Sequence, residues 1–205
     1  MAVVAAFTCA LALVSAGCAT SPAARSSSSA PASAAHSAAD GSRAVASPQI
    51  EMNPPGDIPD NQAFVPYRGA GFSVAIPEGW AKTTTPNAVA FTDKYNSVTI
   101  TVARSQTAPT VATVKSAVVP TIESAAKGFV FESVTAVQRR AGAAILVAFK
   151  ELSPVNAVTG KVTEQAVQHY EFWRQGTLVT LTLAGPVGAD NVDPWRTVTD
   201  SFAWA

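Results

Sequence analysis

Residues 144–149 read AILVAF, a run in which every side chain is apolar. Because successive side chains of a β-strand point to opposite faces, a strand of this composition is apolar on both faces. Such a strand belongs in the middle of a sheet that is covered on both sides. The run therefore predicts a sheet with further layers of structure packed against it.

The sequence around this run predicts six more strands. Turn residues separate the predicted strands: Gly142 precedes the run, and the pair Gln175-Gly176 lies between the last two strands. Several of the strands alternate apolar and polar positions. The seven predicted strands are residues 72–76, 88–92, 98–102, 129–140, 143–152, 162–173 and 179–183. Short turns between most of them favour antiparallel pairing.

Two helices are predicted between and after these strands. Thr110 can cap a helix whose apolar residues recur at spacings of three and four, and Gly128 can end it. Pro120 interrupts that pattern, so a kinked helix or a broken pair is expected. The second helix would begin with Asp193 as N-cap and Pro194 as first residue. The predicted fold class is α+β, an antiparallel sheet of about six to seven strands with helices on its faces, as an α/β/α sandwich.

The N-terminal residues have a different character. Residues 2–14 form an uncharged apolar run, too short for a membrane-spanning helix of about 20 residues but right for the core of a signal peptide. Small residues at 15–17 then precede Cys18, and this ending resembles the lipobox of bacterial lipoproteins. The resemblance implies cleavage before Cys18 and attachment of lipid, palmitate included, to that cysteine.

The composition changes again after Cys18. Ala, Ser and Pro make up 27 of the 45 residues from 19 to 63, so this segment has too little apolar surface to compensate for the entropy lost on ordering. Residues 64–205 hold 15 of the 16 aromatic side chains. The predicted organisation is a signal peptide at 1–17, a disordered tether with lipidated Cys18 at 18–63 and a folded domain at 64–205.

Charge and cysteine content exclude several classes of protein. The chain has 14 basic and 14 acidic residues, so its net charge provides no attraction for nucleic acid. Two cysteines cannot build a disulfide scaffold or a cysteine-rich zinc site. No metal, cofactor or nucleic-acid partner is expected.

Two motifs resemble a known fold. Residues 71–80, GFSVAIPEGW, look like the opening of PsbP-like domains, in which a strand ends in Pro-x-Gly-Trp. Residues 188–195, GADNVDPW, and 201–204, SFAW, are similar to the tail of exported actinobacterial lipoproteins, among them the LpqN type. The resemblance covers residues 66–204. It implies a PsbP-like fold and an accessory or binding role, with no shared catalytic constellation.

Reactive side chains are few in the predicted domain. His169 and Glu171 are two residues apart on a predicted strand and therefore share a face. No Gly-x-Ser-x-Gly elbow presents a nucleophile. A zinc site needs at least three ligands, and the domain has one histidine and only scattered carboxylates. A structural pair explains His169 and Glu171 better than catalysis does, and the chain is interpreted as not an enzyme.

Aromatic side chains supply a candidate binding groove. Trp173 lies near a strand end beside Tyr170, and Trp80 follows a turn. The predicted groove combines Trp173, Tyr170, His169, Glu171 and Trp80. Packing in the core is the alternative for each tryptophan.

Together these features predict a lipoprotein on the outer face of the cytoplasmic membrane that carries a non-catalytic interaction module. Its partner would be another envelope protein or a cell-wall component. The alternative is a carrier of a small ligand or lipid, with an apolar pocket between the sheet and a helix.

The substitution Cys18→Ala tests the anchor. Lipid attachment needs the cysteine sulfur, and two acyl chains suffice for stable membrane binding. We expect the wild-type protein in the membrane fraction and the variant in the soluble fraction, measured by immunoblotting after ultracentrifugation. Cys9→Ala is the matched control, because Cys9 lies inside the predicted signal peptide. An unmodified Cys18 in the mass spectrum of the wild-type protein would contradict the prediction.

Overall fold

A computed structural model describes residues 47–50 and 55–205 of the chain. The predicted signal peptide, Cys18 and most of the predicted tether lie outside the described residues. No helix within the described ranges is long and apolar enough to cross a membrane.

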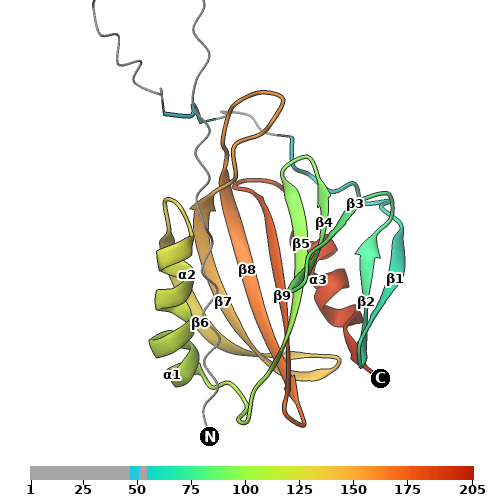
Figure 1. Ribbon diagram of the computed structural model, residues 1–205. Coiled ribbons are helices and arrows are strands. Elements are labelled where there is room, and N and C mark those ends of the chain that lie inside the picture. The colour runs from blue at the N-terminus through green and yellow to red at the C-terminus, as the bar shows by residue number, and fades with distance from the viewer. Residues whose placement is uncertain (1–46, 51–54) are drawn as a thin grey trace, which may run out of the picture. The chain divides into compact units, whose positions relative to one another are not determined.

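The larger of two sheets has seven antiparallel strands in the order β3-β4-β5-β9-β8-β7-β6 (Figure 1). Its strands are β3 (Ala81–Thr84), β4 (Ala88–Asp93), β5 (Asn96–Arg104), β6 (Val130–Arg139), β7 (Gly142–Leu152), β8 (Glu164–Arg174) and β9 (Thr177–Pro186). Strand β9 is the last of this sheet along the chain. It pairs with β5 and so joins strands β3 to β5 to strands β6 to β8 in one sheet. The apolar run 144–149 lies in β7, which has a neighbour on each side.

A smaller sheet has three strands in the order β1-β2-β10. They are β1 (Phe64–Gly69), β2 (Phe72–Pro77) and β10 (Ala203–Trp204). The predicted strand at 72–76 is therefore confirmed as β2, but in a sheet of its own. Strands β1, β3 and β10 were not predicted. Of these, β3 is exposed throughout and β10 has only two residues, so neither shows an apolar pattern.

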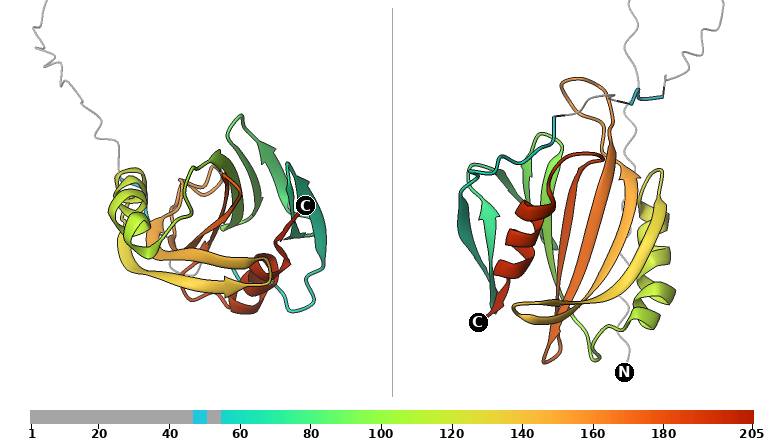
Figure 2. Two further views of the ribbon diagram at one scale, coloured as in Figure 1. Left: turned by 90° about the horizontal axis from the view of Figure 1, so that it is seen from below. Right: turned by 180° about the vertical axis from the view of Figure 1, so that it is seen from behind.

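Two layers cover the larger sheet (Figure 2). On one face lies a helical stretch of α1 (Val111–Thr113), the π-helical segment η1 (Val114–Val118) and α2 (Val119–Ala125). Its valines pack on Ile145, Val147 and Phe149 of β7. On the other face lie the smaller sheet and α3 (Val192–Ser201). The predicted α+β sandwich is confirmed.

Three phenylalanine rings join the layers on the α3 face. The ring of Phe202 stacks on Phe172 of β8 at a centroid distance of 4.3 Å. It also stacks on Phe72 of β2, at 5.7 Å. All three side chains are buried. This Phe72–Phe202–Phe172 stack therefore connects the smaller sheet to the larger one through the residue that follows α3.

The first helical stretch begins and breaks as the sequence predicts. Thr110 caps α1, and its side chain forms a reciprocal capping box with Thr113. Pro120 lies in the first turn of α2, directly after the π-helical segment. Proline has no N–H to donate to the preceding turn. A regular helix through this region would lack the hydrogen bond that the N–H of residue 120 normally makes. The wider turn of η1 lies just before this position.

The predicted cap of α3 was wrong. Asp193 lies in the first turn, and Asn191 occupies the N-cap position without a capping hydrogen bond from its side chain. The Asn191 side chain is used elsewhere: its Oδ1 accepts from the backbone N–H of Ile58 at 2.9 Å. Its Nδ2 donates to the carbonyl of Gly56 and to Asn96 Oδ1, each at 3.0 Å. These bonds fasten the incoming chain to the domain.

Two features make this attachment tight. Ile58 is buried in the core beside the α3 face. A Cβ at Gly185 would lie 2.5 Å from Asn96 Oδ1 and 2.8 Å from Asn191 Nδ2, so only glycine leaves room for the amide pair. The chain therefore enters the domain at a defined point, beside the start of α3.

We expect Asn191→Ala to lower the free energy of unfolding by about 2–3 kcal/mol, because it leaves the buried backbone N–H of Ile58 and the buried Oδ1 of Asn96 without their partner. Chemical denaturation measures the change. Asn87→Ala is the control, because Asn87 is exposed and should leave stability unchanged. An equal effect of the two substitutions would show that the amide network contributes nothing.

Candidate functional site

Two neighbouring hairpins of the larger sheet separate at their tips. Pairing of β7 with β8 ends where Ala144 lies opposite Phe172. Pairing of β8 with β9 continues to Arg174 opposite Thr177. A hollow of about 410 Å³ lies where the hairpins diverge, and we call it the wedge. It is lined chiefly by residues 141–145, Glu171, Trp173, Arg174 and Trp204.

Small side chains keep the wedge open. Residues 141–144 read AGAA, and Ala136 of the neighbouring strand also lines the hollow. A methyl group is the largest side chain in this run. Ala143 is exposed, so its methyl group points into the open volume rather than into the core. A larger side chain at this position would fill the wedge without displacing core residues.

Two tryptophans reach the wedge from different layers. Trp173 extends from the end of β8, and its Nε1 donates to the backbone carbonyl of Ser105 at 2.9 Å. This bond holds the segment between β5 and α1 beside the wedge. Trp204 comes from β10, pairs with Phe72 and meets the ring of Phe202 edge-on at 5.1 Å. The indole of Trp204 is therefore positioned by the phenylalanine stack.

A buried carboxylate lies inside the wedge. The Glu171 side chain is only 6% exposed, and its Oε1 is 3.7 Å from His169 Nε2. That distance is too long for a hydrogen bond, and His169 Nε2 has no hydrogen-bond partner among the described residues. The other ring nitrogen, Nδ1, lies 3.0 Å from Thr182 Oγ1. The wedge thus has an acidic group at its inner end.

These three residues have the composition of a catalytic relay but not its geometry. Thr182 lies directly opposite His169 in the β8–β9 ladder, where backbone N–H groups are committed to strand pairing. Stabilisation of an oxyanion needs free donors beside the nucleophile. Orientation of the histidine needs a hydrogen bond from its ring N–H to the acid, which the 3.7 Å separation does not provide. Within the described part of the chain, no group of three or more His, Cys, Asp or Glu could hold a metal ion.

The structure brings together three of the five residues in the predicted groove. His169, Glu171 and Trp173 lie on one face of β8, and Glu171 and Trp173 line the wedge. Tyr170 lies on the opposite face, where its hydroxyl accepts from Arg139 Nη2 at 2.9 Å. Trp80 packs against the core outside the wedge. Binding in this groove stays a prediction.

Sequence reasoning missed Trp204, Arg174 and the small residues at 141–144. Alternation along β8 was a signal that could have separated Tyr170 from Trp173. The AGAA run beside a predicted turn was a second signal, because four small residues cannot fill the space at the end of a strand. No local pattern indicates that Trp204 reaches the same place.

Comparisons with known proteins identify the fold. No protein-family model matches the sequence, and no curated protein sequence matches it. The solution structure of cyanobacterial PsbP (CyanoP) from Synechocystis sp. PCC 6803 is similar, with a TM-score of 0.54 and 15% identity. The similarity covers 75% of this chain and 99% of that protein.

Two further solved structures are similar at lower scores. The Ran-binding protein Mog1p of Saccharomyces cerevisiae has a TM-score of 0.48 and 11% identity, over 70% of this chain and 95% of that one. LpqN of Mycobacterium tuberculosis, described as involved in cell envelope biogenesis, has a TM-score of 0.43 and 13% identity, over 70% and 91%.

The order of strands, the covering layers and the similarity to CyanoP define an α+β protein. More narrowly, the chain has a PsbP-like fold, as the motif at residues 71–80 predicts. At 15% identity the likeness concerns the fold alone.

We expect Trp173→Phe to lower the free energy of unfolding by about 1 kcal/mol, because it removes the hydrogen bond to Ser105. It should also speed amide hydrogen exchange in residues 105–108, which mass spectrometry measures. Trp80→Phe is the matched control, because the Trp80 indole N–H makes no hydrogen bond with a described residue. Unchanged exchange in this segment of Trp173→Phe would contradict the assigned role of the indole.

Proposed function

We propose that this chain is a non-catalytic binding module, held outside the cytoplasmic membrane by a lipid on Cys18 and by the tether that leads from Cys18 to the domain. The observation that carries this proposal is the wedge. It is an apolar recess with a buried carboxylate at its inner end and an arginine at its rim, and its volume lies in the range of known ligand sites. The side chains of the wedge support binding of a ligand rather than catalysis.

The position of the wedge suits a tethered module. The chain enters the domain at Gly56, which lies against Pro186, and Pro186 pairs with Gln165 near the start of β8. The wedge lies at the other end of β8, beside Arg174. Nine residue steps of a strand correspond to about 30 Å. A partner at the wedge therefore stays clear of Gly56, since β8 runs the length of the sheet between the two places (Figure 1).

The alternative function, a carrier with an apolar pocket between sheet and helix, has less support. Val114 and Val119 pack on Ile145 and Val147 at one interface between the sheet and a helix. At the other interface, Trp195 and Val198 of α3 are buried in the core. The hollow lined by small apolar residues lies instead at the strand ends and is partly open to solvent.

The partner that fits this proposal is another component of the cell envelope, a protein or a cell-wall component. The motifs at residues 188–195 and 201–204 support placing the chain among exported actinobacterial lipoproteins of the LpqN type. The proposed location follows from Cys18 and the apolar run before it. The proposed lack of enzymatic activity follows from the geometry around His169.

A wedge-filling substitution tests the proposal. We expect Ala143→Trp to occupy the recess and to abolish cross-linking of the full chain to its partner in native envelopes, while wild-type protein is cross-linked. Adducts are detected by gel mobility and by mass spectrometry of the purified protein.

The matched control is Ala81→Trp, which places the same side chain on β3 at an exposed position away from the wedge. It should give the wild-type pattern of adducts. Adducts that persist in Ala143→Trp, with thermal unfolding equal to that of the wild type, would rule out the wedge as the binding site.

A further inference from the structure

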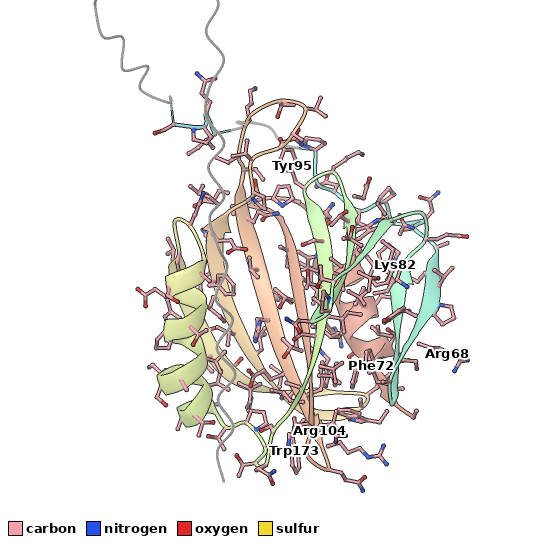
Figure 3. All side chains as sticks on the ribbon, viewed as in Figure 1. Arg68, Phe72, Lys82, Tyr95, Arg104 and Trp173 are labelled. Carbon is pink, nitrogen blue, oxygen red and sulfur yellow. The ribbon has the colours of Figure 1, made fainter. Side chains whose placement is uncertain are left out.

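Three exposed arginines gather at the wedge end of the domain without acidic partners. Arg104 ends β5, Arg140 lies in the turn between β6 and β7, and Arg174 ends β8. No carboxylate of a described residue lies within 4.0 Å of any of them. By contrast, Arg139 and Arg196 share Asp200, at 3.8 Å and 3.5 Å. Figure 3 shows Arg104 beside Trp173 at this end.

Strand register aligns two of these arginines. Thr177 of β9 lies opposite Arg104 of β5 and opposite Arg174 of β8. Residues in register on neighbouring strands share a face of the sheet, so both guanidinium groups leave from the same face on either side of Thr177. Arg104 Nη1 donates to Thr177 Oγ1 at 3.3 Å, which leaves most of its N–H groups available. A hollow of about 300 Å³ lies over this row.

This polar hollow adjoins the wedge. Arg174 and Trp204 line the wedge, the hollow over Thr177 and a third hollow of about 420 Å³ that includes Arg140. The apolar wedge and the basic rim therefore meet at Arg174 and Trp204. Arginine binds phosphate and carboxylate through paired N–H donors, and it does so most strongly where no carboxylate of the protein competes.

The acidic side chains near the site do not form ion pairs with the arginines of the rim. Glu171 lies at the inner end of the wedge beside His169. Asp200 is engaged by Arg139 and Arg196. None of the three arginines therefore forms an ion pair with a described acidic side chain.

We propose that the wedge binds an anionic amphiphile. The anionic head, a phosphate or carboxylate, lies between Arg104 and Arg174, and the apolar chain lies along residues 141–144 between Trp173 and Trp204. This assignment rests on the proposed binding function of the wedge and names the chemistry of its ligand. A free anion would leave the apolar wedge unused, and a neutral amphiphile would leave the arginines unpaired.

Isothermal titration calorimetry tests the assignment. The protein is the full chain with Cys18→Ala, and the probes are dodecyl phosphate, dodecyl maltoside and inorganic phosphate, each below its micellar concentration where it has one. We expect dodecyl phosphate to bind at least tenfold more tightly than dodecyl maltoside and at least 100-fold more tightly than inorganic phosphate. Its affinity should fall as salt is raised, because screening weakens exposed charge interactions.

Substitutions separate the head from the chain. The double variant Arg104→Gln/Arg174→Gln should lose at least tenfold in affinity for dodecyl phosphate and keep its affinity for dodecyl maltoside. Ala143→Trp should abolish binding of both amphiphiles. Arg68→Gln is the control, because Arg68 is exposed and lines none of the three hollows. It should bind as the wild type does.

Several results would overturn the proposal. If dodecyl phosphate binds no more tightly than dodecyl maltoside, the arginines do not bind the head group. If inorganic phosphate binds as tightly as dodecyl phosphate, the wedge does not bind the apolar chain. Envelope cross-linking that depends on position 143, together with no binding of dodecyl phosphate, keeps the wedge as a binding site and overturns only the assignment of its ligand.

Discussion

The stack of Phe72, Phe202 and Phe172 is the contact on which the rest of the arrangement depends. Each ring belongs to a different part of the chain, and each is almost fully buried. The stack holds the smaller sheet against the larger one and sets where the chain runs after α3. Trp204 follows two residues later, so the packing of one apolar core also positions a side chain at the surface recess.

The recess arises at the same level of the sheet. Phe172 is the last residue of β8 that pairs with β7, opposite Ala144. Beyond it the strands no longer share hydrogen bonds, and only small residues lie on the β7 side. Backbone pairing and core packing therefore stop together, which opens a hollow where the strands end rather than inside the sandwich. A hollow at strand ends combines apolar walls with charged rims, because arginines at strand ends reach solvent.

Much of the fold is predictable from local patterns, and the exceptions have physical causes. Alternation and turn residues predict β2 and six strands of the larger sheet, and Thr110 caps its helix as expected. Asp193 does not cap α3, because the preceding Asn191 is held by contacts with Gly56, Ile58 and Asn96, which are distant in sequence. In the candidate site, alternation along β8 puts His169, Glu171 and Trp173 together and places Tyr170 on the other face.

By itself, the sequence determined strands β2 and β4 to β9, the two covered faces of β7 and the PsbP-like opening at residues 71–80. These features depend on side-chain periodicity and turn chemistry within a few residues. Only the tertiary structure decided that Trp173, Arg174 and Trp204 meet Arg104 at one end of the domain. Those residues come from β5, β8 and β10, and their meeting depends on which strands pair and where pairing ends. That information resides in long-range packing, since no local stretch of sequence contains all the partners.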